Sequence, residues 1–474
     1  MKGALTGNLL QEHGQVNHPE KGTILTATVQ SSILKILALG SAAGVLTILA
    51  GPAVGAPAPQ RAADTSVQRI EEIHSFFNVP ANKVKIQFPI PETGYAWQNM
   101  SRFYPTAMIL RDGPISELPV KLDPSIGKIT FQKGDKTETV DEHLANYPVD
   151  GFMVVQKGRV VFERYLTMRP FDKHNWFSSG KVMGATMLAL LEAEGKVDVK
   201  KPVSHYLPQV KGSAWDTVTV EETLDMATGL DSTEHDEPNH DSRTNPEQGW
   251  YRWAVTMGLF YNPEQKETSP YEVMKTMQRR QPGHRVFEYN SIDTFTVNRI
   301  VEQVTGKPLN EVFSERVWRK MGAEADAYVA VSSQGYALMF GMTSSTLRDM
   351  ARFGMIFTPS WKEISKEQIV PDKVLKMIQT TVRPEIFGGG YVGKKMQKSF
   401  PEENGLTNRY QWDAIFADGD LFKSGVGGQG IYISPSRDIV VAWFCHGDGN
   451  NQEETMARAI VKALGPPDKR AHSK

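Results

Sequence analysis

Two β-hairpin patterns, one before a long helical stretch and one after it, constrain the fold of this chain more than any other feature. The first pairs the apolar, β-branched runs 151–155 and 160–166 across a tight turn. The second pairs residues 430–433 with residues 439–444. Since hairpin strands need neighbours to bury an apolar face, we expect one antiparallel sheet assembled from both ends of the chain.

The long middle of the chain, from about residue 182 to residue 380, has the patterns of helices broken by loops. Residues 291–305 and 309–321 are two examples of helical spacing. Together with the hairpins, this predicts an α+β fold, an α/β sandwich, in which helices flank the antiparallel sheet. We expect a mostly helical insertion at about residues 200–400.

The N-terminal segment differs from the rest of the sequence. Residues 36–59 carry no charge, follow Lys35, and place small residues after their most apolar part, which is typical of an export signal. The alternative is an uncleaved membrane anchor, which needs about 20 apolar residues, whereas interrupting glycines disfavour a buried helix. Either way the remaining chain is expected outside the cytoplasm, in the periplasm or anchored on the outer side of the cytoplasmic membrane.

These patterns divide the chain into three parts. We assign residues 1–60 to the signal or anchor with its connector, and expect membrane contact only there. Residues 61–142 form an extension to which the sequence assigns no function. Residues 143–474 form the main domain, and neither its oligomeric state nor cleavage of the N-terminal segment can be predicted.

Charge and cysteine content exclude several classes of protein. Lys and Arg number 53 against 54 Asp and Glu, so no positive field exists to attract nucleic acid. The single cysteine, Cys445, cannot form an internal disulfide. It follows an apolar run and is expected to be a small buried hydrophobe.

Several patterns that suggest cofactors fail on context. Gly425, Gly427 and Gly430 form a G-x-G-x-x-G, but they precede a hairpin, whereas a dinucleotide fingerprint precedes a helix. P-loop, H-E-x-x-H and G-x-S-x-G patterns are missing from the sequence. The group that suggests metal ligands lies in a polar loop that we expect to be solvated: His235, Asp236, His240 and Asp241. We therefore predict neither a metal nor an organic cofactor.

A Ser-x-x-Lys pattern occurs three times, and only Ser178 to Lys181 opens a clear helix. A serine at a helix N-terminus lies near unpaired N–H groups that stabilise negative charge. Lys181 follows on the same helical face and, if desolvated, could accept the serine proton near neutral pH. The alternative at this site is a capping serine with a solvated lysine.

Two further clusters could face this pair. Tyr289-x-Ser291 precedes a helix, where the phenol could relay a proton and Ser291 could bond Lys181. Lys423-Ser424-Gly425 opens a glycine loop that could bring a backbone N–H to a carbonyl oxygen, with Lys423 as a nearby cation. The alternatives are a core tyrosine and a solvated turn lysine.

The three motifs, in this order, resemble those of the serine β-lactamase and penicillin-binding-protein superfamily. The resemblance covers residues 151–464 and is greatest to the class C and family VIII esterase branch that contains 6-aminohexanoate-dimer hydrolase. It implies an acylated nucleophile at Ser178, a base at Lys181 and a general acid/base at Tyr289. It also implies an oxyanion hole from backbone N–H groups of Ser178 and Val426, with Gln429 as the other candidate donor.

Two departures from the superfamily's motifs bear on the substrate. Its Lys-Thr-Gly has Ser424 at the second position here, which would keep Lys423 able to pair with a substrate carboxylate. Its Tyr-x-Asn ends in Ser291 here, which favours an esterase or amidase. The resemblance therefore implies an exported serine hydrolase that cleaves a small ester or amide through an acyl-enzyme. The alternatives are a β-lactamase or D-amino-acid peptidase, or an idle penicillin-binding sensor.

One further segment is a candidate for the pocket wall. The loop from Ser232 to Arg252 contains Trp250 and Tyr251. These aromatic side chains could either line a substrate pocket or pack within the loop.

Overall fold

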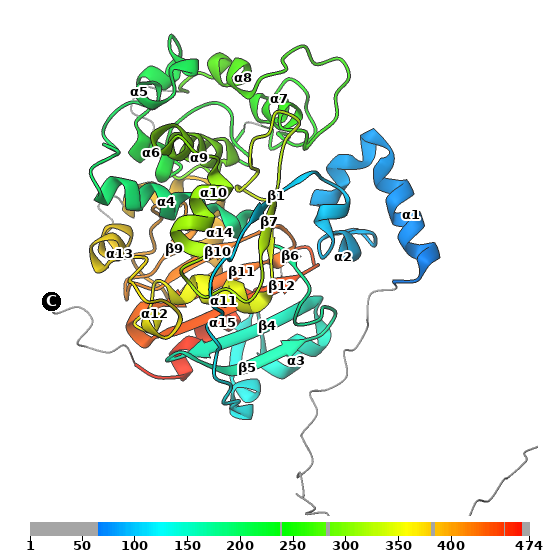
Figure 1. Cartoon of the computed structure of the whole chain (residues 1–474), viewed down its shortest axis with the longest axis vertical. Helices are drawn as coiled ribbons and strands as arrows, with labels where there is room; N and C mark the ends of the chain where they lie inside the picture. The colour runs from blue at the N-terminus through cyan, green and yellow to red at the C-terminus, as the bar shows by residue number, and fades with distance from the viewer. Residues whose placement is uncertain (1–64, 238, 281–284, 381–383, 450, 467–474) are drawn as a thin grey trace, which may run out of the picture. The chain divides into compact units, whose positions relative to one another are not determined.

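A computed structural model describes residues 65–237, 239–280, 285–380, 384–449 and 451–466 (Figure 1). The predicted export signal or anchor at residues 1–60 lies outside these ranges. In the described ranges, every helix is too short or too polar to cross a membrane.

The main sheet has six antiparallel strands drawn from both ends of the chain. Its order is β5 (Arg159–Tyr165), β4 (Val149–Gln156), β12 (Ile439–Cys445), β11 (Gly430–Ser434), β10 (Leu421–Ser424) and β9 (Ala414–Ile415). Figure 1 shows the cyan strands β4 and β5 beside the orange strands from the C-terminal part. Val154 pairs with Val441 across this junction. The predicted sheet from both chain ends is confirmed.

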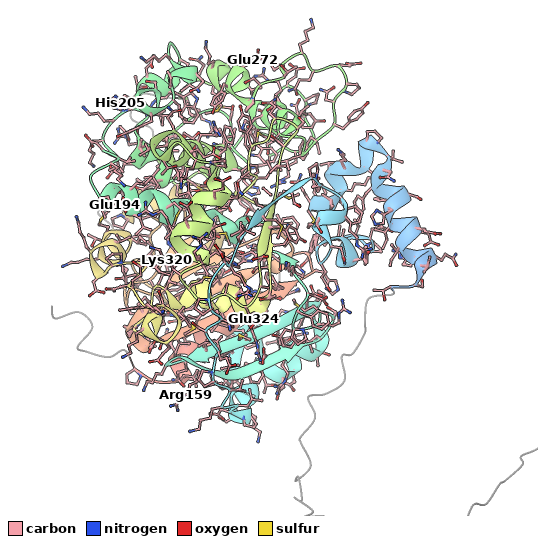
Figure 2. All side chains as sticks on the ribbon, in the orientation of Figure 1. Arg159, Glu194, His205, Glu272, Lys320 and Glu324 are labelled. Carbon is pink, nitrogen blue, oxygen red and sulfur yellow. The ribbon has the colours of Figure 1, made fainter. Side chains whose placement is uncertain are left out.

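Side chains that alternate along the strands fill two cores, one on each face of the sheet. Met153 and Val440 face the core that contains α4, α9 and α11, whereas Val154 and Val441 face the core that contains α15. Burial on both faces makes the sheet the middle layer of a sandwich, as predicted. Exposed charged side chains such as Glu194 lie on the outside of these layers (Figure 2).

The hairpin between β4 and β5 shows why the strand register is well defined. Its two turn residues, Lys157 and Gly158, both have positive φ, 49° and 74°. A two-residue turn of this geometry matches the right-handed twist of the strands that it joins. The lysine-glycine pair therefore specifies the hairpin locally.

The inserted region is mostly helical, but it also contributes two strands. A second sheet has the order β1 (Thr106–Ile109), β7 (Ala327–Ala330), β8 (Thr343–Ser345) and β6 (His174–Asn175). A separate two-stranded sheet pairs β2 (Thr130–Lys133) with β3 (Lys136–Thr139). The helices are α1 (Val67–Asn78), α2 (Thr93–Ala96), α3 (Val140–Asn146), α4 (Lys181–Ala193), α5 (Val203–Tyr206), α6 (Val220–Leu224), α7 (Gly249–Thr256), α8 (Pro270–Thr276), α9 (Ser291–Thr305), α10 (Leu309–Phe313), α11 (Leu347–Met355), α12 (Trp361–Ile364), α13 (Asp372–Gln379), α14 (Tyr391–Ser399) and α15 (Glu453–Ala463).

The start of α15 differs from its sequence pattern. Asn451 and Glu454 suggest a capping box, but α15 begins at Glu453 and is preceded by Gln452 at φ 62°, whose side chain makes no capping bond. The left-handed residue redirects the chain into the helix and removes the geometry that a capping asparagine needs. Cys445 is buried at the end of β12, as predicted.

Candidate active site

Ser178 lies in a 3₁₀ turn, Phe177–Gly180, that leads directly into α4. Phe177 has φ 46°, a left-handed conformation that costs free energy in a bulky residue. The ring of Trp97 holds it in an edge contact with centroids 4.8 Å apart. The turn thus places Ser178 at the N-terminal end of a buried helix.

Lys181 is fully buried on the first turn of α4. Its Nζ donates hydrogen bonds of 2.7 Å to Ser291 Oγ and 2.7 Å to the carbonyl oxygen of Phe340. Burial lowers the pKa of Lys181 to about 7, against the smaller opposing effect of Glu234. A large share of this amine is therefore neutral at neutral pH, so the solvated-lysine alternative is wrong.

Tyr289 directly precedes α9, whose first turn is capped by Asn290, which accepts a 3.0 Å bond from Ile292 N. The phenol hydrogen-bonds the Ser178 side chain and accepts a 3.1 Å bond from Lys423 Nζ. Burial raises the pKa of Tyr289 well above its ordinary value. The side chain packs in the core while its protonated hydroxyl faces Ser178.

Lys423 does not have the solvated environment that was the alternative for it in the sequence analysis. Its Nζ is fully buried and forms an ion pair with Asp413, whose other oxygen accepts bonds from Ser424 N at 2.9 Å and Ser424 Oγ at 2.6 Å. Lys423 is therefore not a solvated turn lysine. Asp413 and Tyr289 take up two of its hydrogen-bond donors, and Lys423 lines neither of the cavities that contain Ser178.

The glycine loop after β10 approaches Ser178 closely. A Cβ on Gly425 would lie 2.6 Å from the carbonyl oxygen of Trp176 and 3.1 Å from Ser178 N. In the described chain, neither Ser178 N–H nor Val426 N–H donates to another residue. Glycine at this position thus lets two unpaired N–H groups approach one another.

Gln429 supports this loop with its side chain. Its Nε2 donates to the carbonyl oxygens of Val426 and Cys445, and its Oε1 accepts a 2.8 Å bond from Cys445 N. The amide is therefore engaged with backbone groups of the loop and of β12. The side chain thus holds the loop against β12, and the choice between the backbone N–H groups of Val426 and Gln429 stays a prediction.

Glu234 is a buried member of the site that the sequence did not reveal. It accepts a 2.8 Å bond from Ser291 N and a bond from Ser291 Oγ, and it pairs with Arg243 at 2.9 Å. Burial alone would raise the pKa of Glu234, but Lys181 and Arg243 hold it below its ordinary value. A negative charge thus lies beside Lys181, and no spacing in the loop could have indicated it.

The loop around Glu234 is more tightly packed than expected. Ser232, Thr233 and Glu237 are buried, whereas His240 is exposed, as expected. Burial lowers the pKa of His235 to about 4, so that its ring is neutral. The residues that contact this loop are far away in the sequence, so its polar composition did not predict its burial. Asp236 Oδ1, for example, accepts a 2.7 Å bond from Tyr391 N.

Two cavities meet at Ser178. The larger, about 370 Å³, is also lined by Tyr289, Val426 and, from the N-terminal extension, residues 87–89. The smaller, about 40 Å³, is lined by Ser291 and Trp250. Trp250 therefore belongs to the wall, and the extension contributes to the larger cavity.

Tyr251 does not line either cavity. Its ring packs on Phe260, with centroids 5.0 Å apart. The prediction of an aromatic wall thus applies to Trp250, while Tyr251 packs within its own region.

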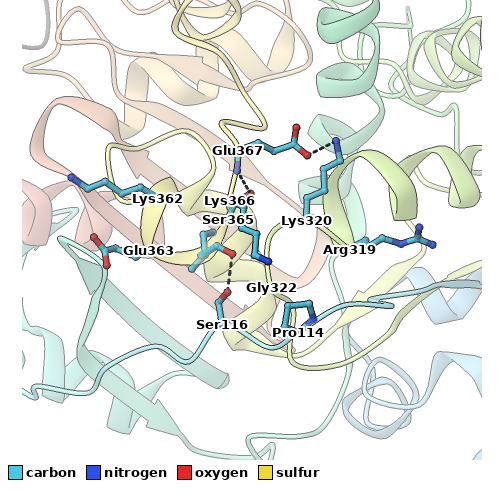
Figure 3. Close-up of a pocket in the computed structure, with 11 residues that line it drawn as sticks. Pro114, Ser116, Arg319, Lys320, Gly322, Lys362, Glu363, Ser365, Lys366 and Glu367 are labelled. Atoms are coloured by element: carbon cyan, nitrogen blue, oxygen red, sulfur yellow. Dashed lines mark hydrogen bonds and ion pairs between the residues drawn. The ribbon is translucent and has the colours of Figure 1, made fainter.

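A pocket remote from Ser178, of about 330 Å³, lies between Pro114 and the segment after α12 (Figure 3). Lys320 pairs with Glu367 at 2.7 Å, and Ser116 Oγ donates a 2.8 Å bond to the carbonyl oxygen of Ile364. Its lining shares no residue with the cavities at Ser178. The cavities at Ser178 therefore form the candidate active site.

Comparisons with known proteins agree with this geometry. A family model described as beta-lactamase matches residues 137–465. A 6-aminohexanoate-dimer hydrolase from Paenarthrobacter ureafaciens is 26% identical over 355 residues, covering 74% of this chain and 84% of the relative. The solved structure of a putative 6-aminohexanoate-dimer hydrolase from Bacillus anthracis has a TM-score of 0.66 and 21% identity, covering 79% of this chain and 94% of that one.

A second solved structure shares the fold. EstCE1, described as a hydrolase with promiscuous acyltransferase activity, has a TM-score of 0.50 at 15% identity and covers 67% of this chain and 93% of its own. The matched family model spans more than half of the present sequence. The chain therefore belongs to the beta-lactamase family and is a serine hydrolase of the β-lactamase and penicillin-binding-protein superfamily.

Proposed function

We propose that this protein hydrolyses an ester or amide through an acyl-enzyme on Ser178. The observation that carries the proposal is the environment of Lys181, a buried amine with a pKa of about 7 one helical turn from a serine whose hydroxyl bonds Tyr289. Such an amine can accept a proton at neutral pH, which an ordinary lysine cannot do.

In the first half-reaction, the neutral Lys181 amine takes the proton of the Ser178 hydroxyl while the serine oxygen attacks the substrate carbonyl carbon. The carbonyl oxygen becomes an oxyanion held by the N–H groups of Ser178 and Val426. When the tetrahedral intermediate collapses, the alcohol or amine leaves with a proton from Tyr289. Water then attacks the acyl-enzyme and gives one proton to the Tyr289 phenolate, and Ser178 regains its proton from Lys181 as the acid leaves.

The position of Lys423 supports an ester or linear amide as substrate. The cation that would bind the carboxylate of a β-lactam is buried against Asp413. Similarity to 6-aminohexanoate-dimer hydrolase, over 84% of that relative, supports the same substrate class. The uncharged stretch 36–59 supports export, with the enzyme acting outside the cytoplasm.

Labelling with a fluorophosphonate, followed by peptide mass spectrometry, tests the nucleophile. We expect one phosphonyl adduct, on Ser178. Ser179→Ala is the matched control, because the Ser179 hydroxyl is buried and donates a 2.6 Å bond to the Trp176 carbonyl oxygen. An adduct that persists in Ser178→Ala, or that disappears only in Ser179→Ala, would contradict the assignment.

A substrate panel of short esters, linear amide oligomers, D-amino-acid peptides and a cephalosporin separates the reaction classes. We expect turnover of the esters or linear amides. A β-lactam adduct that persists, with no turnover of any ester or amide, would identify a penicillin-binding sensor instead.

The pH dependence of the reaction follows from Lys181. Its protonated form cannot accept the serine proton, so kcat/KM for a p-nitrophenyl ester should rise about tenfold per pH unit below the pKa of about 7 and level off above it. The measurement is an initial-rate profile between about pH 5 and pH 9, with folding monitored by circular dichroism. A profile that is flat through neutrality would show that Lys181 is not the base.

A further inference from the structure

The cavity at Ser178 continues into a second, larger cavity. This neighbour has a volume of about 630 Å³, against about 370 Å³ for the cavity at Ser178. Tyr391, Lys395, Gly449 and Glu454 line both. The second cavity therefore adjoins the cavity at Ser178, and we call it the lysine groove.

The lysine groove is lined by Lys394, Lys395 and Lys398 of α14 and by one carboxylate, that of Glu454. In the described ranges, no carboxylate lies within ion-pair distance of the three lysines, and Lys395 Nζ donates a 3.3 Å bond to the Gly449 carbonyl oxygen. Burial raises the pKa of Glu454, and the positive charge of Lys395 opposes that rise. The groove therefore carries an excess of positive charge.

The arrangement of lysines does not stabilise α14 itself. Lys394 and Lys398 are four residues apart, so their like charges repel along one face of α14. On the opposite side of the helix, Val392 and Met396 are buried and hold the lysine side over the groove. The lining holds three ammonium groups and one carboxylate, so its surplus positive charge is available to an external anion.

The other cations of the site are occupied. Lys423 pairs with Asp413, and Arg243 pairs with Glu234 at 2.9 Å. An anionic group on a substrate would therefore be attracted to the lysine groove, and not to a cation next to the reacting carbonyl.

We propose that the lysine groove binds an anionic end, a carboxylate, of an elongated ester or amide whose scissile bond lies at Ser178. This inference rests on the proposed hydrolysis at Ser178 and specifies its substrate class. Because each exposed ion pair contributes a factor of about two to three, three lysines should favour the anionic substrate by about tenfold in kcat/KM.

Matched substrates test the groove on each side of the scissile bond. One series consists of mono-p-nitrophenyl esters of adipic, suberic and sebacic acids, each compared with its methyl-capped form. The other consists of butyrate esters of ω-(4-hydroxyphenyl)alkanoic acids, again with and without a methyl cap. In at least one series we expect the free acid to be preferred about tenfold at low salt and less at high salt.

The double variant Lys394→Gln/Lys398→Gln leaves Lys395 in place and should lower the ratio of acid to capped substrate to about two to three, and Lys394→Glu/Lys398→Glu should invert it. Lys362→Gln/Lys366→Gln is the control, because it removes the same charge at the pocket of Figure 3 and should leave the ratio at about ten.

The outcomes separate this proposal from the proposed function. If hydrolysis depends on Ser178 but neither series shows a preference for the acid, or if the groove variants leave the preference intact, the lysine groove proposal is wrong. If hydrolysis of the capped esters survives in Ser178→Ala, the proposed function itself is wrong.

Discussion

Replacing Ser178 with alanine should lower kcat/KM for a p-nitrophenyl ester by at least about 10⁴-fold, since no covalent intermediate can form. The cavity at Ser178, the two N–H groups and the Lys181 amine all remain in this variant, so any residual rate reports binding and electrostatic stabilisation alone. Initial rates measured at saturating and at low substrate separate the loss in kcat from a change in KM.

The control for this variant is a measurement of its stability by urea unfolding. The substitution removes one hydroxyl that bonds Tyr289, so the free energy of unfolding should change by no more than about 1 kcal/mol. A variant that unfolds at the same urea concentration as wild type but retains more than about 1% of its activity would disprove the nucleophile assignment.

Replacing Asp413 with alanine should produce the largest loss of stability among the site variants. Asp413 is the carboxylate paired with fully buried Lys423, and burial already lowers the pKa of that lysine. An unpaired buried ammonium costs about 3–5 kcal/mol in the free energy of unfolding. Activity should fall with stability, because Lys423 also donates to the Tyr289 hydroxyl.

Urea denaturation of two further variants separates the cost of the unpaired buried charge from the loss of the hydrogen bond to Tyr289. Asp413→Ala/Lys423→Met removes both charges and should recover most of the stability, while activity stays low because the hydrogen bond to Tyr289 is still missing. Asp413→Asn, which keeps polar contacts to Ser424, should be less destabilised than Asp413→Ala. If Asp413→Ala unfolds at the wild-type urea concentration, the buried ion pair contributes nothing.

The features that could be predicted from sequence are those encoded locally. The turn at Lys157 and Gly158, the alternation in the neighbouring strands and the helix that follows Ser178 depend on residues close together in the chain. Tyr289 was recognisable because it directly precedes a helix. The order of the three motifs supplied the resemblance, and the family match over residues 137–465 agrees with it.

The features that could not be predicted depend on contacts between distant segments. Glu234 has no neighbouring pattern, and its role comes from contacts with Ser291 and Arg243. The pairing of Lys423 depends on Asp413 of the preceding segment, and a lysine in a turn looks the same with or without that partner. Residues 87–89 reach the larger cavity only through the packing of the N-terminal extension.

The pairing of β4 with β12 has a consequence for biosynthesis. β12 lies between β4 and β11 and follows both of these strands in the chain. Until it emerges, the nascent polypeptide has two half-sheets with open hydrogen-bonding edges, which are prone to aggregate. Closing so long a loop is slow, so the two half-sheets stay open to association until β12 has been made and has paired with both.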